Sequence, residues 1–375
     1  MMNKFFLIIL VVILVKPGHT QKRLNNPFKG VEPLSIEGSF KMKDHIVWGG
    51  SVVQHDGKYY MFVSIYPDSI GRGSWVANSR VALAIADHPE GPYQFEKIVL
   101  PYRDKSFWDG RMTHNPTIHK HNDKYYLFYI GTTYQHKRPI RDITHKDPVR
   151  QEAWTNQRIG VAVADHPLGP WKRPDQPVIE PRKGKWDMSI TTNPAPVIHD
   201  DGSVLLIYKS TNMVYPERME RHSKDGLPRF IMGAAKAGHP LGEYERIGDR
   251  DGMITLEGRL SSLEDPFVWY QDGVYHMLIK NFEKDFVSKT GAGIYVWSMN
   301  GHEWFLPKDD PLVYTREVSW KEGITTVQRK LERPQVYFEN GRPAYIFLGT
   351  GFREKYWDVV QNPVKTYNVV FKIKR

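Results

Sequence analysis

Five stretches of the chain repeat one pattern, and this repeat constrains the fold more than any other feature of the sequence. Each stretch begins with a polar pair, usually followed by proline, continues as alternating apolar residues, turns through Asp, Asn or Gly, and ends in a second apolar run. The stretches begin at Trp48, His114, Thr192, Glu264 and Glu332. Alternation on both sides of a tight polar turn is typical of a β-hairpin, so the sequence predicts five hairpins.

A second, weaker repeat follows the first. The stretch RVALAIADHPEGPYQF from Arg80 matches RIGVAVADHPLGPWKR from Arg158 and FIMGAAKAGHPLGEYER from Phe230, with a blurred fourth copy from Gly293. Two hairpins give each unit four strands, and four-stranded units repeated around an axis form a β-propeller. We therefore predict an all-β fold, a single five-bladed β-propeller with four-stranded antiparallel blades over residues 21–375. The run 367–373 is expected to close the ring by pairing with an N-terminal blade.

The first twenty residues have the pattern of a targeting segment. A short basic start is followed by eleven apolar residues from Phe5 to Val15, and then by the small residues Gly18 and Thr20. This pattern predicts a signal peptide over residues 1–20, too short to span a bilayer; the alternative is an uncleaved anchor. We expect an exported protein, periplasmic or secreted, with no membrane association after cleavage.

The charge balance indicates an anionic partner. Lys and Arg number 52 against 42 Asp and Glu, a net charge of +10 that falls to about +8 without the leader. Such a surplus suits nucleic acid, an acidic surface or an acidic polysaccharide. Export disfavours nucleic acid, and aromatic residues at 13% suit sugar stacking. The expected partner is therefore an acidic oligosaccharide. The absence of cysteine excludes disulfides, thiolate metal sites and a cysteine nucleophile.

The repeat also predicts where a functional site lies. The first strand of each blade begins near the central axis, so the residues at the five hairpin starts are expected to converge on one pocket. An alternative explanation is structural, because proline fixes the start of a strand and a polar neighbour caps a turn. A charged side chain buried at the axis, however, needs an ion-pair partner or a functional role. The converging residues are Trp48, Gly49, His114, Asn115, Thr192, Asn193, Glu264, Asp265, Glu332 and Arg333.

The polar-Pro hairpin starts, the Glu264-Asp265-Pro266 segment and the repeated Asp-His-Pro second halves resemble the five-bladed glycoside hydrolases of families 43 and 117. The resemblance implies exo-acting chemistry on a terminal sugar. It also implies a first-blade carboxylate base, a middle-blade Asp that tunes pKa and a Glu acid on a later blade. The sequence departs from this pattern, with Gly49 and Gly50 in the first blade and Asn115 and Asn193 in the next two.

Two reactions fit these residues. Hydrolysis of a glycoside needs a proton donor and a second carboxylate, which Asp265, Glu332 and Glu264 can supply, with Asp44 as a substitute. Elimination from a uronic acid instead needs a base, for which His114 is the candidate, and cations or amides around the sugar carboxylate. A sugar-binding propeller without catalysis is the third possibility. The residues expected to bind substrate are Asp44, Trp48, Arg111, Asn115, Asn193, Lys209, His276 and Arg333.

Other motif classes are weak or missing. The sequence has neither a phosphate-binding glycine loop nor a G-x-S-x-G serine elbow. His119 and His121 alternate on one predicted strand, but no third ligand follows at a metal-site spacing. We therefore predict no metal and no cofactor, and no residue pattern indicates an ion in the axial channel. Two long insertions, 134–155 and 215–229, are expected to form loops over the pocket.

Overall fold

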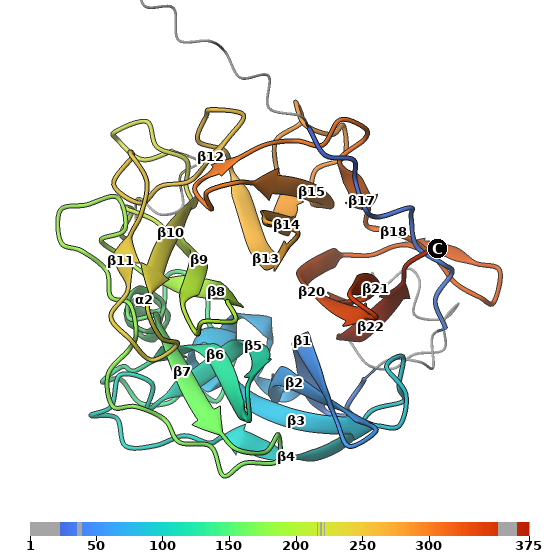
Figure 1. Cartoon of the computed structure of the whole chain (residues 1–375). Helices are drawn as coiled ribbons and strands as arrows, with labels where there is room; N and C mark the ends of the chain where they lie inside the picture. Colours follow the sequence, from blue (N-terminus) through green and yellow to red (C-terminus); the bar gives the residue numbers. More distant parts are fainter. Residues whose placement is uncertain are drawn as a thin grey trace, which may run out of the picture.

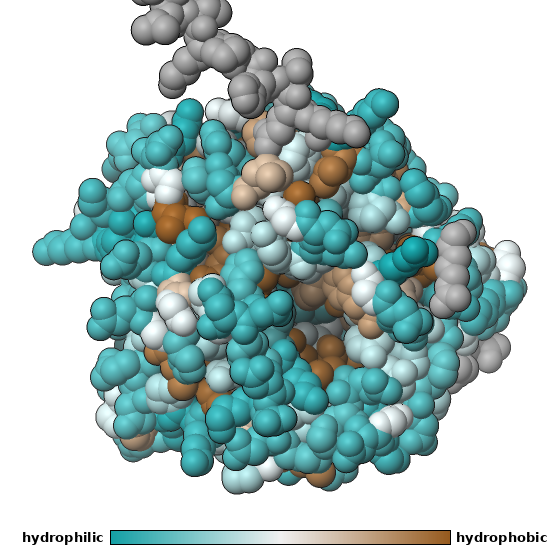
Figure 2. All heavy atoms as spheres, in the orientation of Figure 1, coloured by the Kyte–Doolittle hydropathy of each residue, from teal (hydrophilic) through white to brown (hydrophobic). Residues whose placement is uncertain are grey.

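The computed structural model describes residues 23–35, 40–215, 217, 220, 222–351 and 366–374, and the predicted signal peptide lies outside them. Five antiparallel sheets stand in a ring around a central axis, as the sequence repeat predicts (Figure 1). The space-filling view shows a hollow at the centre of the ring (Figure 2). In the described part of the chain, no helix has both the length and the apolar character needed to cross a membrane.

The innermost strand of each blade comes first in the chain. The first blade contains β1 (His45–His55), β2 (Lys58–Pro67), β3 (Arg80–Ala86) and β4 (Gln94–Leu100). The second contains β5 (Met112–His121), β6 (Lys124–Thr132) and β7 (Arg158–Ala164). The third contains β8 (Thr192–Ile198), β9 (Val204–Ser210), β10 (Ile231–Ala237) and β11 (Glu245–Arg246).

The last two blades follow the same order. The fourth contains β13 (Leu263–Gln271), β14 (Val274–Asn281), β15 (Ala292–Ser298) and β17 (Leu312–Tyr314). The fifth contains β20 (Lys330–Glu339), β21 (Arg342–Gly351) and β22 (Tyr367–Lys372). Two small sheets lie between blades: β12 (Thr255–Leu256) with β16 (Glu303–Trp304), and β18 (Glu317–Ser319) with β19 (Thr325–Val327).

The prediction of four strands per blade is confirmed for the first, third and fourth blades and is wrong for the second and fifth. In the second blade, only isolated bridges from Lys172 and Ile179 to β7 stand where a fourth strand is expected. The segment 167–181 contains five prolines, which lack the N–H that a ladder requires. In the fifth blade, the N-terminal segment takes the outer position, because Val31 and Phe40 form bridges with Ile373 and Asn368.

Ring closure therefore differs from the expectation. The C-terminal strand β22 pairs with β21 inside its own blade and not with the first blade. The bridges from Val31 and Phe40 to its free edge tie the start of the described chain to its end. Apolar side chains fill the space between neighbouring blades, for example Val47 and Val63 of the first blade against Phe347 of the fifth. The axis is thus held by five blade-to-blade interfaces.

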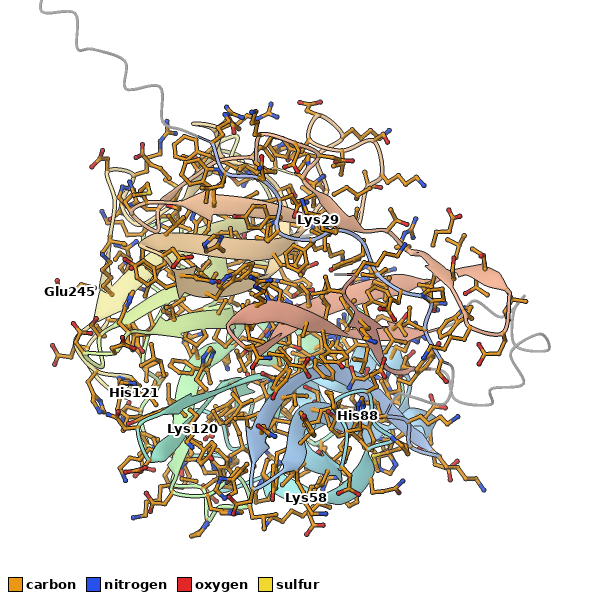
Figure 3. All side chains as sticks on the ribbon, turned by 45° about the vertical axis from the view of Figure 1, so that its right-hand side comes forward. Lys29, Lys58, His88, Lys120, His121 and Glu245 are labelled. Atoms are coloured by element: carbon orange, nitrogen blue, oxygen red, sulfur yellow. The ribbon has the colours of Figure 1, made fainter. Side chains whose placement is uncertain are left out.

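The short helices all lie in connections between strands. Between β2 and β3 the chain forms η1 (Asp68–Ile70), η2 (Arg72–Ser74) and α1 (Trp75–Asn78). Between β6 and β7 it forms α2 (Pro148–Thr155). The opposite ends of the inner hairpins carry the tight turns, flanked by exposed lysines such as Lys58 and Lys120 (Figure 3). The ring consequently has one face with helical insertions and one face with tight turns.

Candidate active site

Every innermost strand carries a β-bulge at the same point of the repeat. Its pairing with the second strand shifts register just after Trp48, His114, Thr192, Glu264 and Glu332. The residue that follows each of these has a positive φ: Gly49 60°, Asn115 49°, Asn193 54°, Asp265 57° and Arg333 58°. Gly, Asn and Asp adopt this left-handed conformation more readily than other residues, and Arg does so at a cost. A bulge re-aims side chains, and here it turns them toward the axis.

The bulge residues of four blades are connected at the axis. Asn115 donates from Nδ2 to Oδ1 of Asn193 at 2.9 Å, and Asn193 donates from Nδ2 to Oδ1 of Asp265 at 2.7 Å. The backbone N–H of Arg333 donates to Oδ2 of Asp265 at 3.2 Å, and its Nη2 donates to Oγ1 of Thr117 at 3.2 Å. Arg333 is only 2% exposed. This layer of side chains closes the axial channel and forms a floor.

Asp265 is the acidic member of this floor. Burial, and then the neighbouring Glu264 carboxylate, raise the pKa of Asp265 to about 6 from its ordinary 3.8, although Arg333 opposes the shift. The folded protein therefore binds the proton of Asp265 more tightly than the unfolded chain does. Ionisation of this group costs stability, and the cost grows as the pH rises from about 4 through 6.

We expect Asp265→Asn to remove this pH dependence. The free energy of unfolding of the wild type should fall relative to that of the variant as the pH rises from 4 to 7, because only the wild type ionises here. Urea unfolding at several pH values measures the difference. Asp272→Asn, which changes an exposed aspartate in the turn after the same strand, is the matched control and should leave the profile unchanged. Parallel profiles for the wild type and Asp265→Asn would contradict the assignment.

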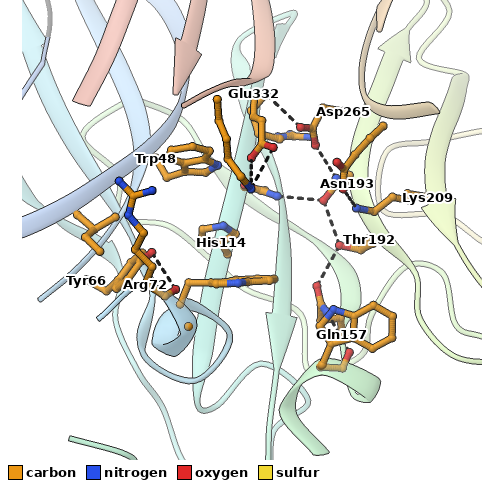
Figure 4. A pocket seen from close by; sticks show the side chains of 18 of the residues that line it. Trp48, Tyr66, Arg72, His114, Gln157, Thr192, Asn193, Lys209, Asp265 and Glu332 are labelled. Atoms are coloured by element: carbon orange, nitrogen blue, oxygen red, sulfur yellow. Dashed lines mark hydrogen bonds and ion pairs between the residues drawn. The ribbon is translucent and has the colours of Figure 1, made fainter. Parts of the chain in front are cut away.

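Above the floor lies a cavity of about 380 Å³ (Figure 4). All of the residues that the repeat places at the axis, except Gly49, line this cavity, and Thr192 and Asn193 lie beside Asp265 and Lys209. Six cationic and three acidic side chains line it, so the pocket carries an excess of positive charge. The charged lining residues are Arg72, Arg150, Lys209, Arg329, Lys330, Arg333, Glu264, Asp265 and Glu332.

Two lysines bridge from one blade to the glutamate of the next. Lys209 on β9 is ion-paired with Glu264, while Lys280 on β14 lies 2.5 Å from Glu332 and 3.6 Å from Glu264. Lys330 adds a contact of 3.2 Å to Glu332. Burial raises the pKa of Glu264, but Lys209 and Lys280 lower it by more, so the net pKa lies well below its ordinary range. Glu264 is therefore a carboxylate at neutral pH.

His114 contributes an imidazole ring to the lining of the pocket. Its Nδ1 shares a hydrogen bond of 2.7 Å with Oγ of Ser79, and the Trp75 ring lies 4.7 Å away between centroids. Burial, together with the positive charge of Arg333, lowers the pKa of His114 to about 3. The ring is neutral at pH 7, and Nε2 is the nitrogen left to meet a bound molecule.

The insertions over the pocket supply residues that the repeat did not identify. Arg72 and Trp75 come from the β2–β3 connection, and Arg150 and Trp154 come from α2, which lies in the long 134–155 insertion. Arg329 also lines the cavity, and burial together with the charge of Arg329 lowers the pKa of Arg72. The length of the 134–155 insertion was the only sequence signal for Arg150 and Trp154, and none was found for Arg72 and Trp75, because these positions do not repeat between blades.

Three predicted residues lie outside the cavity. Asp44 is exposed just before β1, and its carbonyl accepts a hydrogen bond from Asp68. Arg111 precedes β5 and places its guanidinium over the Tyr134 ring at 5.3 Å. His276 lies in the turn-side half of β14, opposite Trp269, whose ring it stacks against at 5.0 Å. Arg111 and His276 are thus held by local ring contacts, and Asp44 is exposed, so none of the three lines the cavity.

The described residues contain no group of three or more His, Asp or Glu side chains placed to hold a metal ion. His119 and His121, which alternate on β5, have separate surroundings. His119 packs edge-on against Phe128 at 6.3 Å, and Nε2 of His121 is paired with the side-chain amide of Asn122 at 3.1 Å.

The fold and its axial pocket define a five-bladed β-propeller of the kind found in solved glycoside hydrolases. The structure of a BT0996 RGII complex matches with a TM-score of 0.64 and 14% identity, covering 93% of this protein and 92% of that one. Zg3597, a family 117 glycoside hydrolase from the marine bacterium Zobellia galactanivorans, matches with a TM-score of 0.57 and 17% identity, covering 93% and 87%.

A third similar structure is CoXyl43, a family 43 β-xylosidase/α-arabinofuranosidase from a compost microbial metagenome, with a TM-score of 0.53 and 16% identity over 93% of this protein and 95% of that one. No family model matches the sequence, and no curated protein sequence is significantly similar to it. These likenesses establish the fold that the sequence repeat predicts.

Proposed function

We propose that the protein is an exported glycoside hydrolase that releases an anionic sugar, a uronic acid, from the non-reducing end of an acidic oligosaccharide. The observation that carries this proposal is a blind pocket with six cationic and three acidic side chains at the axis of the ring. A pocket closed by the Arg333 floor admits the end of a sugar polymer and not its interior. The surplus of cations supports a substrate that carries negative charge.

The two glutamates supply a hydrolytic pair. Glu264 and Glu332 both lie within ion-pair distance of the same Lys280 nitrogen, so their nearest oxygens are at most about 6 Å apart. Retaining glycosidases place their carboxyl groups about 5–5.5 Å apart and inverting ones about 6.5–9.5 Å apart. We assign Glu264, whose pKa lies well below its ordinary range, to attack at the anomeric carbon, and Glu332 to protonate the departing glycosidic oxygen. Glu332, now ionised, takes a proton from a water molecule, whose oxygen bonds to the anomeric carbon as the bond to Glu264 breaks, and the sugar leaves with retained configuration.

Product analysis tests this proposal. The protein is incubated with a panel of acidic plant and algal oligosaccharides, and the products are followed by mass spectrometry and by NMR of the anomeric proton. The expected result is a free uronic acid whose first-formed anomer has the configuration of the substrate bond. Release of the opposite anomer would contradict the Glu264 role. Binding without turnover would contradict catalysis and favour a sugar-binding propeller.

A second function, elimination from a terminal uronate, is favoured by one specific observation. His114 lines the cationic pocket with Nδ1 held by Oγ of Ser79, which leaves Nε2 as the atom that would take the C5 proton. The pocket cations would stabilise the sugar carboxylate while C5 loses its proton and the oxygen substituent on C4 departs with the bonding electrons. A departing hydroxyl takes up a proton and leaves as water.

Elimination gives a different product. A conjugated double bond absorbs in the ultraviolet, and loss of water lowers the mass of the oligosaccharide without releasing a sugar. If this reaction is the true one, His114→Asn should lower kcat by about a hundredfold or more. His88→Asn, which changes an exposed histidine on the ring surface, is the matched control. Unchanged turnover in His114→Asn would remove this residue from the base role.

A further inference from the structure

The opposite face of the ring holds a second cavity, of about 630 Å³, where the far ends of the five innermost strands meet. Its lining begins beyond the Arg333 floor, with Ser51 on β1, Ile118 on β5, Phe267 on β13 and Gln335 on β20. The side chains at the axis therefore separate it from the cationic pocket. None of the predicted site residues lines this cavity.

The walls of the second cavity differ in chemical character. The fourth and fifth blades present the aromatic side chains Trp269, Tyr270, Tyr337 and Phe338. The second and third blades present polar ones, among them His119 and His199. Tyr270 is 44% exposed, so part of its ring is free to receive a ligand. An aromatic wall opposite a polar wall suits a molecule with one apolar face and hydroxyl groups at its edge.

Buried polar atoms in the cavity point to a ligand. Gln335 is only 2% exposed, and its Oε1 has no hydrogen-bond partner among the described protein groups. Nε2 of His119 is likewise buried and unpaired within the part of the chain that the structure describes. A buried polar atom without a partner costs about 1–3 kcal/mol, a cost that a bound hydroxyl group would relieve.

The charge of this cavity argues for an uncharged ligand. Its formally charged lining residues are Lys120, Asp200 and Asp272, which nearly balance, in contrast to the cationic pocket. Burial lowers the pKa of His119 to about 4 and lowers that of His199, so both rings are neutral at pH 7. Neutral imidazoles can donate to and accept from sugar hydroxyls.

We propose that this cavity is a second carbohydrate-binding site, which takes a neutral pyranose or furanose unit of a polysaccharide. The sugar ring stacks on Tyr270, and its hydroxyls bond to Gln335 Oε1 and His119 Nε2. Since the two cavities open on opposite faces, the site holds a polysaccharide separate from the one that is cut. The site does not depend on the proposed reaction.

The test is binding of xylotriose, cellotriose and galactotriose, followed by calorimetry and by the NMR shift of the Trp269 indole N–H. We expect at least one trisaccharide to bind the wild type and to move this resonance. Tyr270→Ala should weaken binding by about tenfold or more, Tyr270→Phe should retain it, and Gln335→Leu should weaken it. Glu332→Gln, in the other cavity, should bind as the wild type does.

Two results would overturn the proposal. The first is that none of the three trisaccharides binds or shifts the Trp269 resonance. The second is that Tyr270→Ala binds normally while Glu332→Gln does not, which would place the sugar in the cationic pocket. Thermal unfolding of each variant confirms that a lost signal reflects the site and not the fold.

Discussion

Glu332→Gln is expected to reduce kcat by about a thousandfold or more while the ring remains folded. The amide has nearly the same shape as the carboxyl group but cannot protonate a departing oxygen, and a positioned acid contributes about 10²–10⁴-fold. Glu332 contacts Lys280 at 2.5 Å and Lys330 at 3.2 Å, so both lysines stay beside the amide oxygen. The measurement is release of the terminal sugar under saturating substrate.

The matched control is Glu317→Gln, which changes an exposed glutamate on β18. It should leave kcat and KM within about twofold of the wild type, because surface substitutions rarely disturb a distant site. A substrate with a good leaving group provides a second test. Because such a group departs with little protonation, Glu332→Gln should act on this substrate at a rate much closer to that of the wild type. Full activity of Glu332→Gln on the natural oligosaccharide would end its assignment as the acid.

Arg333→Met is expected to have the largest effect on stability. The guanidinium is buried at the axis, within 3.9 Å of Oδ1 of Asp265 and hydrogen-bonded to Thr117. Its removal leaves a buried carboxylate without a compensating cation, which costs about 3–5 kcal/mol. Because Asp265 escapes the cost by taking up a proton, the destabilisation should be larger at pH 8 than at pH 5.

Two further variants isolate the cause. Arg342→Met removes an exposed arginine from the same blade and should change the free energy of unfolding by less than about 0.5 kcal/mol. The double variant Arg333→Met/Asp265→Asn carries neither member of this buried pair and should regain much of the lost stability, with a flat pH profile. Urea unfolding measures all four proteins. Equal destabilisation at both pH values would show that packing, and not charge, is the main role of Arg333.

The repeat made the architecture predictable. Five hairpin starts, spaced at nearly even intervals, were enough to give the number of blades and the convergence of Asn115, Asn193, Asp265 and Arg333. The errors fall at the outer strands, where the prolines after β7 prevent a ladder and a segment from the other end of the chain completes the fifth blade. Such long-range pairing leaves no periodic signal in the sequence.

The walls of the site were less predictable than its floor. Arg72, Trp75 and Arg150 come from connections between the second and third strands whose sequences do not repeat between blades, so no other part of the chain reveals their positions. Arg111 was predicted to line the pocket because it lies four residues before Asn115. In the structure its guanidinium packs on the Tyr134 ring instead. Position along a strand does not fix which way a side chain turns once a bulge changes the alternation.

The bulge has nearly the same backbone conformation in all five blades, although the side chains that it carries differ. Gly, Asn, Asp and Arg occupy equivalent positions with nearly the same φ, so the main chain does not need a particular side chain there. The positive φ limits the choice of residue more than space does, because a Cβ on Gly49 would lie 3.4 Å from Cβ of Arg333, an ordinary contact distance. Exchanges at these positions that keep the buried charges of Asp265 and Arg333 balanced can therefore change the reaction of a descendant protein while its blades are inherited unchanged.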